Sequence, residues 1–175
     1  MEKAIFLDRD GVLNEDREGY PHKSEHLILA KNSIEGMKLL SEMDFKRILV
    51  TNQSGVGVGK FAKEDFYSFN EALFSQVGNV HDVFVCFHHK EEGCECRKPS
   101  AKMLEDAAEK HDIDLSKSFV IGDQDRDIEM GINAGCRTIF IKSGAYGSHK
   151  SNGEKANFIA KDLLDAVEWI KQNEN

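Results

Sequence analysis

Proline and tryptophan are almost missing from this sequence, whose 175 residues include two prolines and one tryptophan. Long apolar runs are missing too: none approaches the ~18 residues of a membrane-spanning helix. Because the N-terminus leads straight into a short apolar segment, we expect no signal peptide. Lys and Arg number 23 against 31 Asp and Glu, a net charge of −8. We therefore expect a cytoplasmic protein with no membrane contact and no nucleic-acid partner.

Cysteine is also scarce, with four residues, but three of them lie between positions 86 and 96. This spacing is too tight for an ordinary disulfide framework. Three thiolates and one imidazole are typical ligands of structural Zn²⁺, and the pattern C-x-H-x5-C-x-C predicts Cys86, His88, Cys94 and Cys96. Free thiols are the alternative. We expect the competing imidazole, His89, to face solvent and Cys136 to be a small buried residue.

Short apolar runs alternate with amphipathic stretches along the whole chain. The runs predict strands at 4–7, 47–51, 82–86, 119–122 and 138–141. The stretches predict helices at about 33–43, 63–77, 125–134 and 163–171, with one more after Pro99-Ser100. This alternation predicts an α/β fold, a doubly wound and mainly parallel sheet with helices on both faces. We expect a single domain over 1–175, with the zinc-binding loop 86–96 inserted in it.

The chemically suggestive residues follow the predicted strands. Asp8 and Asp10 come after the first strand, Thr51 ends the second, and Asp123 follows the fourth. Ligands of open parallel sheets bind beyond the carboxyl ends of the strands. Side chains two residues apart in a strand point the same way, so we expect both acids of the first pair to reach one substrate atom and one metal ion. Taken alone, a solvated acid pair is an equally good interpretation.

Three further segments could complete an anion site. The hydroxyl and backbone N–H groups of Thr51-Asn52-Gln53-Ser54-Gly55 could bind phosphate oxygens, although an ordinary glycine-rich turn would have this composition. Arg97 and Lys98 offer a fork and a compact cation, or two solvated basic residues. In Gly122-Asp123-Gln124-Asp125-Arg126-Asp127 the acids could complete a Mg²⁺ shell or favour a helix N-terminus. We expect Asp125 to be only an N-cap.

Together these motifs resemble the haloacid-dehalogenase superfamily of phosphatases. The resemblance covers D-x-D-G at 8–11, T-N at 51–52, the lysine at 98 and G-D-x-x-x-D at 122–127. The zinc loop and the string at 51–55 are similar to the branch that contains heptose 1,7-bisphosphate 7-phosphatases and histidinol-phosphate phosphatases. The resemblance implies a Rossmann-like fold of the haloacid-dehalogenase type without a large cap domain.

The resemblance also implies a mechanism for phosphomonoester hydrolysis. Asp8 would attack phosphorus and form an aspartyl phosphate, while Asp10 would protonate the leaving oxygen and then deprotonate water. Catalytic Mg²⁺ would bind the Asp8 carboxylate, the Asp10 backbone carbonyl and Asp123.

The remaining motif residues would handle the substrate. Thr51 and Lys98 would stabilise the transferring phosphoryl group, Arg97 would recognise the substrate, and Asp127 would orient Lys98 or a metal-bound water. The expected substrate contacts are Asn52, Gln53, Ser54, Arg97 and Lys98. The partner would be a small phosphorylated molecule, acted on by a monomer or small homo-oligomer.

Two substrates remain open. Gly19-Tyr20 with His22-Lys23, and the segment 55–61, resemble the heptose enzymes, whereas the five residues between His88 and Cys94 resemble the histidinol enzymes. We favour removal of the 7-phosphate of D-glycero-D-manno-heptose 1,7-bisphosphate, with histidinol phosphate as the alternative. One rival of another class is a non-catalytic phospho-receiver, against which Asp10 argues, because an acid two residues past the nucleophile promotes hydrolysis. A second is a zinc-stabilised binding module, against which the intact set of acids, threonine and lysine argues.

Overall fold

The computed structural model describes residues 1–16, 21–142 and 151–174, and its centre is one six-stranded parallel sheet. The strand order is β3-β2-β1-β4-β5-β6. The bounds are β1 Ala4–Leu7, β2 Lys46–Asn52, β3 Asp82–Cys86, β4 Phe119–Gly122, β5 Arg137–Ile141 and β6 Phe158–Ala160. Because β1 has β2 on one side and β4 on the other, the chain order reverses beside β1, which is where such sheets bind ligands.

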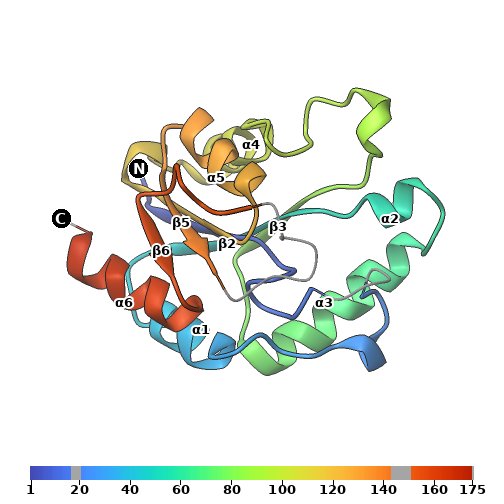
Figure 1. The fold of residues 1–175 in the computed structure, drawn as a ribbon, viewed down its shortest axis with the longest axis horizontal. Coiled ribbons are helices and arrows are strands. Elements are labelled where there is room, and N and C mark those ends of the chain that lie inside the picture. Colours follow the sequence, from blue (N-terminus) through green and yellow to red (C-terminus); the bar gives the residue numbers. More distant parts are fainter. Residues whose placement is uncertain (17–20, 143–150, 175) are drawn as a thin grey trace.

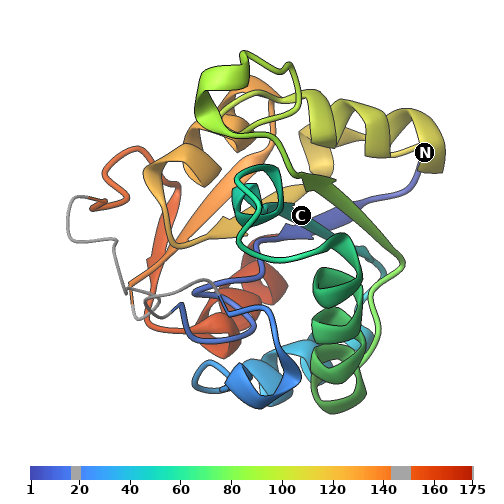
Figure 2. The ribbon, with the colours of Figure 1, turned by 90° about the vertical axis from the view of Figure 1, so that its right-hand side faces the viewer.

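Helices cover both faces of the sheet (Figures 1 and 2). Their bounds are α1 Ser33–Ser41, α2 Ser54–Gly57, α3 Lys63–Val77, α4 Lys102–His111, α5 Asp125–Asn133 and α6 Leu163–Asn173. Within the described residues, three 3-10 turns lie at Ser24–His26, Lys90–Glu92 and Leu115–Lys117. Helices α1, α3 and α6 lie on one face, and α4 and α5 lie on the other.

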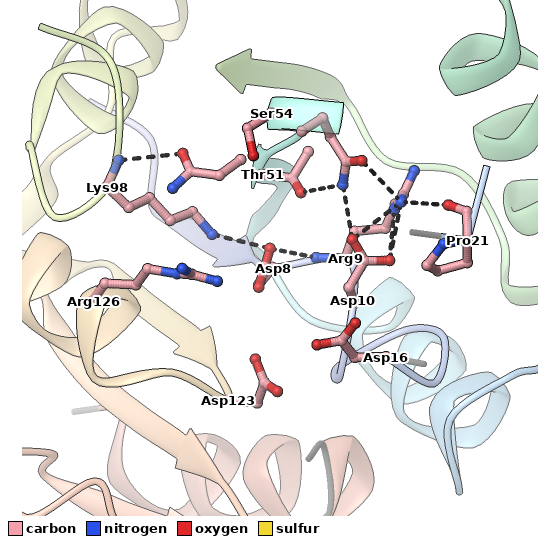
Figure 3. A pocket seen from close by; sticks show the side chains of 12 residues that line it. Asp8, Arg9, Asp10, Asp16, Pro21, Thr51, Ser54, Lys98, Asp123 and Arg126 are labelled. Atoms are coloured by element: carbon pink, nitrogen blue, oxygen red, sulfur yellow. Dashed lines mark hydrogen bonds and ion pairs between the residues drawn. The ribbon is translucent and has the colours of Figure 1, made fainter. Parts of the chain in front are cut away.

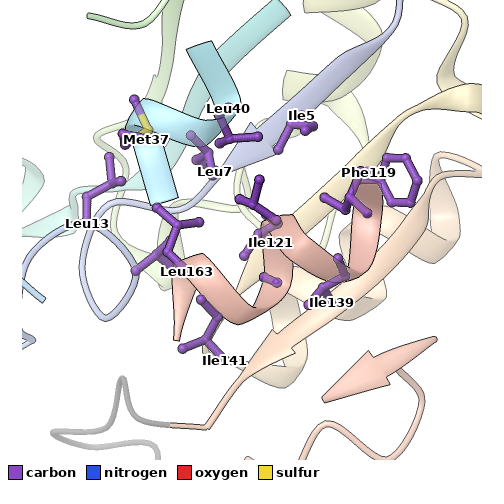
Figure 4. Packing of buried hydrophobic residues seen from close by; sticks show 14 of the residues in the cluster. Ile5, Leu7, Leu13, Met37, Leu40, Phe119, Ile121, Ile139, Ile141 and Leu163 are labelled. Carbon is purple, nitrogen blue, oxygen red and sulfur yellow. The ribbon is translucent and has the colours of Figure 1, made fainter. Parts of the chain in front are cut away.

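Alternation along β1 divides the core between the two faces. Ile5 and Leu7 pack with α1, α3 and α6, whereas Ala4 and Phe6 pack with α4 and α5. Figure 4 shows the first of these clusters, where Leu163 of α6 lies beside Met37 and Leu40 of α1. All four residues of β1 have no exposed surface, so both faces of this strand are apolar. A strand buried on both faces explains a continuous apolar run without polar alternation.

The predicted fold class is confirmed, and so are the five strand positions, three of them to the residue. The short strand β6 and the short helix α2 were missed. From the sequence, Ser100 is a plausible N-cap of α4, but Ala101 holds that position. The Ser100 hydroxyl accepts the Lys102 N–H. The expectation that Asp125 is the N-cap of α5 was wrong: Gln124 holds that position. The Asp125 carboxylate instead accepts the N–H groups of Asn152 and Gly153 and so ties α5 to the next segment.

The described helices include none that is long and apolar enough to cross a membrane. Gly19 and Tyr20, which supported the heptose interpretation, lie outside the described residues.

Candidate active site

A polar pocket opens at the carboxyl ends of β1, β2 and β4 (Figure 3). It collects most of the residues singled out in the sequence, although they lie far apart in the chain. Its lining is Asp8, Arg9, Asp10, Asp16, Pro21, Thr51, Asn52, Gln53, Ser54, Lys98, Asp123 and Arg126. The tertiary fold therefore brings the acids, the threonine and the lysine of the predicted site to one place.

Lys98 lies between two carboxylates. Its Nζ is 3.0 Å from Asp8 Oδ1 and 2.7 Å from Asp127 Oδ1. Burial by itself would lower the pKa of Lys98, but the charges of Asp127 and Asp8 outweigh it and raise the pKa. Burial raises the pKa of Asp8 to about 6, against the attraction of Lys98 and with added repulsion from Asp127 and Asp10. Lys98 is therefore held as a cation beside Asp8.

Asp123, directly after β4, is a buried carboxyl with one unpaired oxygen. Burial raises its pKa to about 9, and the charges of Asp8 and Asp127 add to the shift. Its Oδ1 is buried and has no hydrogen-bond partner among the described residues. Ligand atoms of Asp8, Asp123 and Asp127 lie within 4.8 Å of one another. Clustered oxygen ligands with an unsatisfied lone pair suit Mg²⁺.

Asp127 is a carboxylate with both oxygens occupied. One accepts from Lys98 Nζ, and the other accepts the Gln124 N–H at 3.0 Å. Asp8 and Asp123 are thus the better candidates for metal ligands, whereas Asp127 is bound to the Lys98 ammonium group.

Asp10 lines the same pocket, but protein donors hold its carboxylate. Gln53 Nε2 donates to it at 2.8 Å, Asn14 Nδ2 donates at 2.9 Å, and Arg9 donates through Nε and Nη2. The strand alternation used to align Asp8 with Asp10 does not reach it, because β1 ends at Leu7 and the chain turns at Gly11, whose φ is +83°. Asp8 reaches the pocket directly after β1, and Asp10 reaches it from the segment between β1 and the Gly11 turn.

The end of β2 supplies neutral donors. Thr51 Oγ1 accepts from Gln53 Nε2 at 3.0 Å, which leaves the hydroxyl hydrogen for an anion. Asn52 Oδ1 accepts the Lys98 N–H, and its buried Nδ2 has no partner among the described residues. Ser54 begins α2 at the pocket wall. Gln53 was expected to contact substrate, yet both ends of its amide already bind Arg9, Asp10 and Thr51.

A second cluster joins Cys86, His88, Cys94 and Cys96. The sulfur pairs Cys86–Cys94 and Cys94–Cys96 are 3.6 and 3.7 Å apart, and His88 Nδ1 is 3.3 Å from Cys96 Sγ. Disulfide sulfurs are ~2.0 Å apart, whereas a tetrahedral Zn²⁺ with ~2.3 Å bonds places its sulfurs roughly 3.8 Å apart. The spacing therefore fits a four-ligand metal site.

His89 and Cys136 are not part of this cluster. The His89 ring stays outside the group, near the exposed Glu91, and is itself partly exposed to solvent. Cys136 is buried elsewhere.

The loop at 86–96, called the cysteine loop below, is joined to the pocket by hydrogen bonds that backbone N–H groups donate. Gln53 N–H donates to the Cys86 carbonyl at 2.8 Å, and the Lys98 N–H donates to Asn52. A Cβ on Gly57 of α2 would lie 2.4 Å from the Phe87 carbonyl oxygen, so only glycine allows this approach. A metal that orders the loop would therefore also fix the backbone of Lys98.

Sequence reasoning missed three charged residues of the pocket, of which Arg9 is one. Asp16 has a pKa raised to about 7 by burial and by the charges of Asp10 and Asp8. Arg126, exposed at the start of α5, also lines the pocket. Its position three residues after Asp123, on the first turn of a helix at a strand end, is the signal that could have found it. Arg97, the predicted recognition residue, instead donates to the His88 carbonyl at 3.2 Å and is not part of the lining.

Comparisons with known proteins agree with this geometry. The family model described as HAD-hydrolase-like matches residues 95–166. The sheet order and the buried carboxylate–lysine site thus define a hydrolase of the haloacid-dehalogenase type. The chain is 35% identical to the D-glycero-beta-D-manno-heptose-1,7-bisphosphate 7-phosphatase of Helicobacter pylori J99, over 97% of each chain. It is 35% identical to the enzyme of that name from Pasteurella multocida, over 98% of each chain.

A solved structure gives the same result. The D,D-heptose 1,7-bisphosphate phosphatase of B. bronchiseptica, crystallised with magnesium and phosphate, superposes with a TM-score of 0.86 at 30% identity. The superposition covers 98% of this chain and 99% of that one. The chain therefore belongs to the haloacid-dehalogenase-like hydrolases, in the family of these heptose bisphosphate phosphatases.

Proposed function

We propose that this protein is a Mg²⁺-dependent phosphatase that removes the 7-phosphate of D-glycero-D-manno-heptose 1,7-bisphosphate. The observation that carries the chemistry is the convergence of Asp8, Lys98 and the unpartnered Asp123 oxygen in one pocket. The relatives at 35% identity over nearly the whole length support the substrate.

In the proposed reaction the Asp8 carboxylate attacks phosphorus and forms an aspartyl phosphate. Lys98 and the Thr51 hydroxyl balance the charge that develops on the phosphoryl oxygens. Asp10 gives a proton to the leaving oxygen as the P–O bond breaks, then takes one from the water that hydrolyses the intermediate. The Asn52 amide, with its free N–H groups, and the Ser54 hydroxyl bind the phosphate.

Two metals fit the residues present. Asp8, Asp123 and the Asp10 backbone carbonyl would hold Mg²⁺, which would neutralise charge between nucleophile and phosphate. Cys86, His88, Cys94 and Cys96 would hold a structural Zn²⁺, because all four positions are protein ligands. The four free cysteines suit a reducing compartment, so the proposed location is the cytoplasm.

The proposal is tested by a phosphate-release screen with Mg²⁺. Heptose 1,7-bisphosphate, histidinol phosphate and other sugar bisphosphates are compared for kcat/KM. The expected result is the highest value for the heptose bisphosphate, whereas a higher value for histidinol phosphate would replace the substrate.

Asp8→Asn tests the assignment of the nucleophile, and the stability of the wild-type phosphoprotein separates an enzyme from a phospho-receiver. The variant should fold and lose turnover, since the amide cannot attack phosphorus. A wild-type protein that keeps a stable phosphoryl group and releases no phosphate would favour the receiver and contradict the proposal.

A further inference from the structure

Arg9 is an almost fully buried arginine in the wall of an open pocket. It stands between Asp8 and Asp10 in the sequence and is 1% exposed. Its guanidinium lies over the rings of Phe69 and Phe66, at 4.5 and 5.5 Å from their centroids. Burying a charge costs several kcal/mol unless it is paired, so the partners of this guanidinium are informative.

Those partners converge on Asp10. Arg9 Nε is 3.1 Å from Asp10 Oδ1, and Nη2 is 3.0 and 3.1 Å from its two oxygens. The other acceptors are neutral: Asn70 Oδ1, the Pro21 carbonyl and Gln53 Oε1. Asp10 is therefore the carboxylate paired with Arg9 among the described residues, and Figure 3 shows the two side chains against each other at the pocket edge.

We propose that Arg9 is a positioning residue that aims the Asp10 carboxyl group at the leaving oxygen, an inference that rests on the proposed phosphatase function. A planar guanidinium fork fixes an orientation as well as a charge, which an ammonium group cannot do. When the P–O bond breaks, the Asp10 proton moves to the leaving oxygen and Asp10 becomes a carboxylate. Arg9 already lies where that charge forms.

Arg9 is held from its far side, as a positioning role requires. Asn70 is 4% exposed on α3 and accepts from Nη1, while the two phenylalanine rings of the same helix cover the guanidinium. Asp10 is thus connected to α3 through Arg9. Proton transfer needs hydrogen-bond reach, and a misplacement of about 1 Å costs on the order of 10²-fold in rate.

Leaving-group dependence tests this role. We would measure kcat/KM for the heptose bisphosphate, whose sugar alkoxide must be protonated, and for acetyl phosphate, whose acetate leaves unaided. Hydrolysis of the phosphoenzyme follows both and does not enter kcat/KM. Arg9→Gln should lower kcat/KM about 100-fold for the sugar substrate and less than about 5-fold for acetyl phosphate. Equal losses on both substrates would make Arg9 a structural residue and overturn the proposal.

Two further variants distinguish a positioning role of Arg9 from a purely structural one. Asp10→Asn should show the same selective loss, and the double variant should be no worse on the sugar substrate than Asp10→Asn alone. Asn70→Leu removes one of the groups that hold Arg9 and keeps the Asp10 contacts, so its loss should also be selective for the sugar substrate but smaller than that of Arg9→Gln. Beryllofluoride binding with Mg²⁺, which attaches to Asp8 without a leaving group, checks that each variant is folded.

The outcomes separate this inference from the function on which it rests. Absence of turnover by the wild type would remove the proposed function itself. A selective loss in Asp10→Asn together with uniform losses in Arg9→Gln would remove only the role of Arg9. If Arg9→Gln does not bind beryllofluoride, Arg9→Lys, which keeps the charge but not the fork, carries the same comparison and should show a smaller selective loss.

Discussion

The ammonium group of Lys98 lies 2.7 Å from a carboxylate oxygen of Asp127, and each side chain is 1% exposed. Breaking a buried pair from one side typically costs about 3–5 kcal/mol. Because Asp127 also repels Asp8 and Asp123, its removal brings some relief. We expect Asp127→Asn to lower the free energy of unfolding by about 3 kcal/mol, measured in urea, and to lower kcat.

A surface pair on α4 is the matched control for this variant. Asp106 pairs with Lys102, and the two side chains are 40% and 44% exposed. Asp106→Asn should change stability by less than about 1 kcal/mol. Equal effects of the two substitutions would contradict the assignment of Lys98 and Asp127 as a buried structural pair.

The pocket carboxyls predict a pH dependence for the metal-free protein. The pKa values of Asp8, Asp16 and Asp123 are raised from 3.8 to about 6, 7 and 9. Each therefore keeps its proton to higher pH in the folded than in the unfolded chain. Their contribution to stability is full below about pH 4 and is lost as the pH rises through 6 to 9.

Magnesium should reverse this trend, because it binds the ionised carboxylates in competition with protons. Saturating Mg²⁺ should raise Tm by about 4 °C or more at pH 8.5 and by less than about 1 °C at pH 5. Differential scanning fluorimetry measures both. Asp123→Asn should abolish the shift, and an equal Mg²⁺ shift at the two pH values would speak against a carboxylate metal site.

The cysteine cluster predicts a selective effect of thiol replacement. Cys94→Ser removes one of four ligands, so bound zinc should fall well below one equivalent in metal analysis and Tm should drop. Cys136→Ser, also at a cysteine but outside the cluster, is the control and should keep its zinc. Unchanged zinc in Cys94→Ser would remove the structural zinc site.

The place of Arg126 in the pocket lining predicts that it binds the second phosphate of a bisphosphate substrate. It is exposed, it lines the pocket, and a charge-assisted contact with phosphate is worth about 1.5–3 kcal/mol. Arg126→Ala should raise KM for the bisphosphate roughly 10-fold or more and leave KM for a monophosphate nearly unchanged. Arg97→Ala is the comparison, since the same role was expected of Arg97 from the sequence. A larger effect at Arg97 would move the second phosphate out of the described pocket towards the cysteine loop.

Local pattern was enough for much of the fold. The apolar runs at β1 and β4 set their bounds because strands buried on both faces have no polar residues inside them. The strand β6 has three residues, one of them exposed Ile159, so it carries too little apolar signal to be found alone. Helix α2 has the composition of a turn and is held in place by contacts with the cysteine loop.

The sequence by itself determined the doubly wound sheet, the cysteines and histidine that cluster in the cysteine loop, and the acids, threonine and lysine that meet at one edge. The sheet, the acids and the threonine follow from periodicity and from chemistry at strand ends, and the cysteine cluster follows from ligand spacing, which are local properties. The place of the lysine came from the resemblance to a known family. Only the tertiary structure decided the partners: the burial of Arg9 against Asp10, the position of Arg126 in the pocket and that of Arg97 outside it. Pairing depends on distances between segments remote in the chain, which no local pattern encodes.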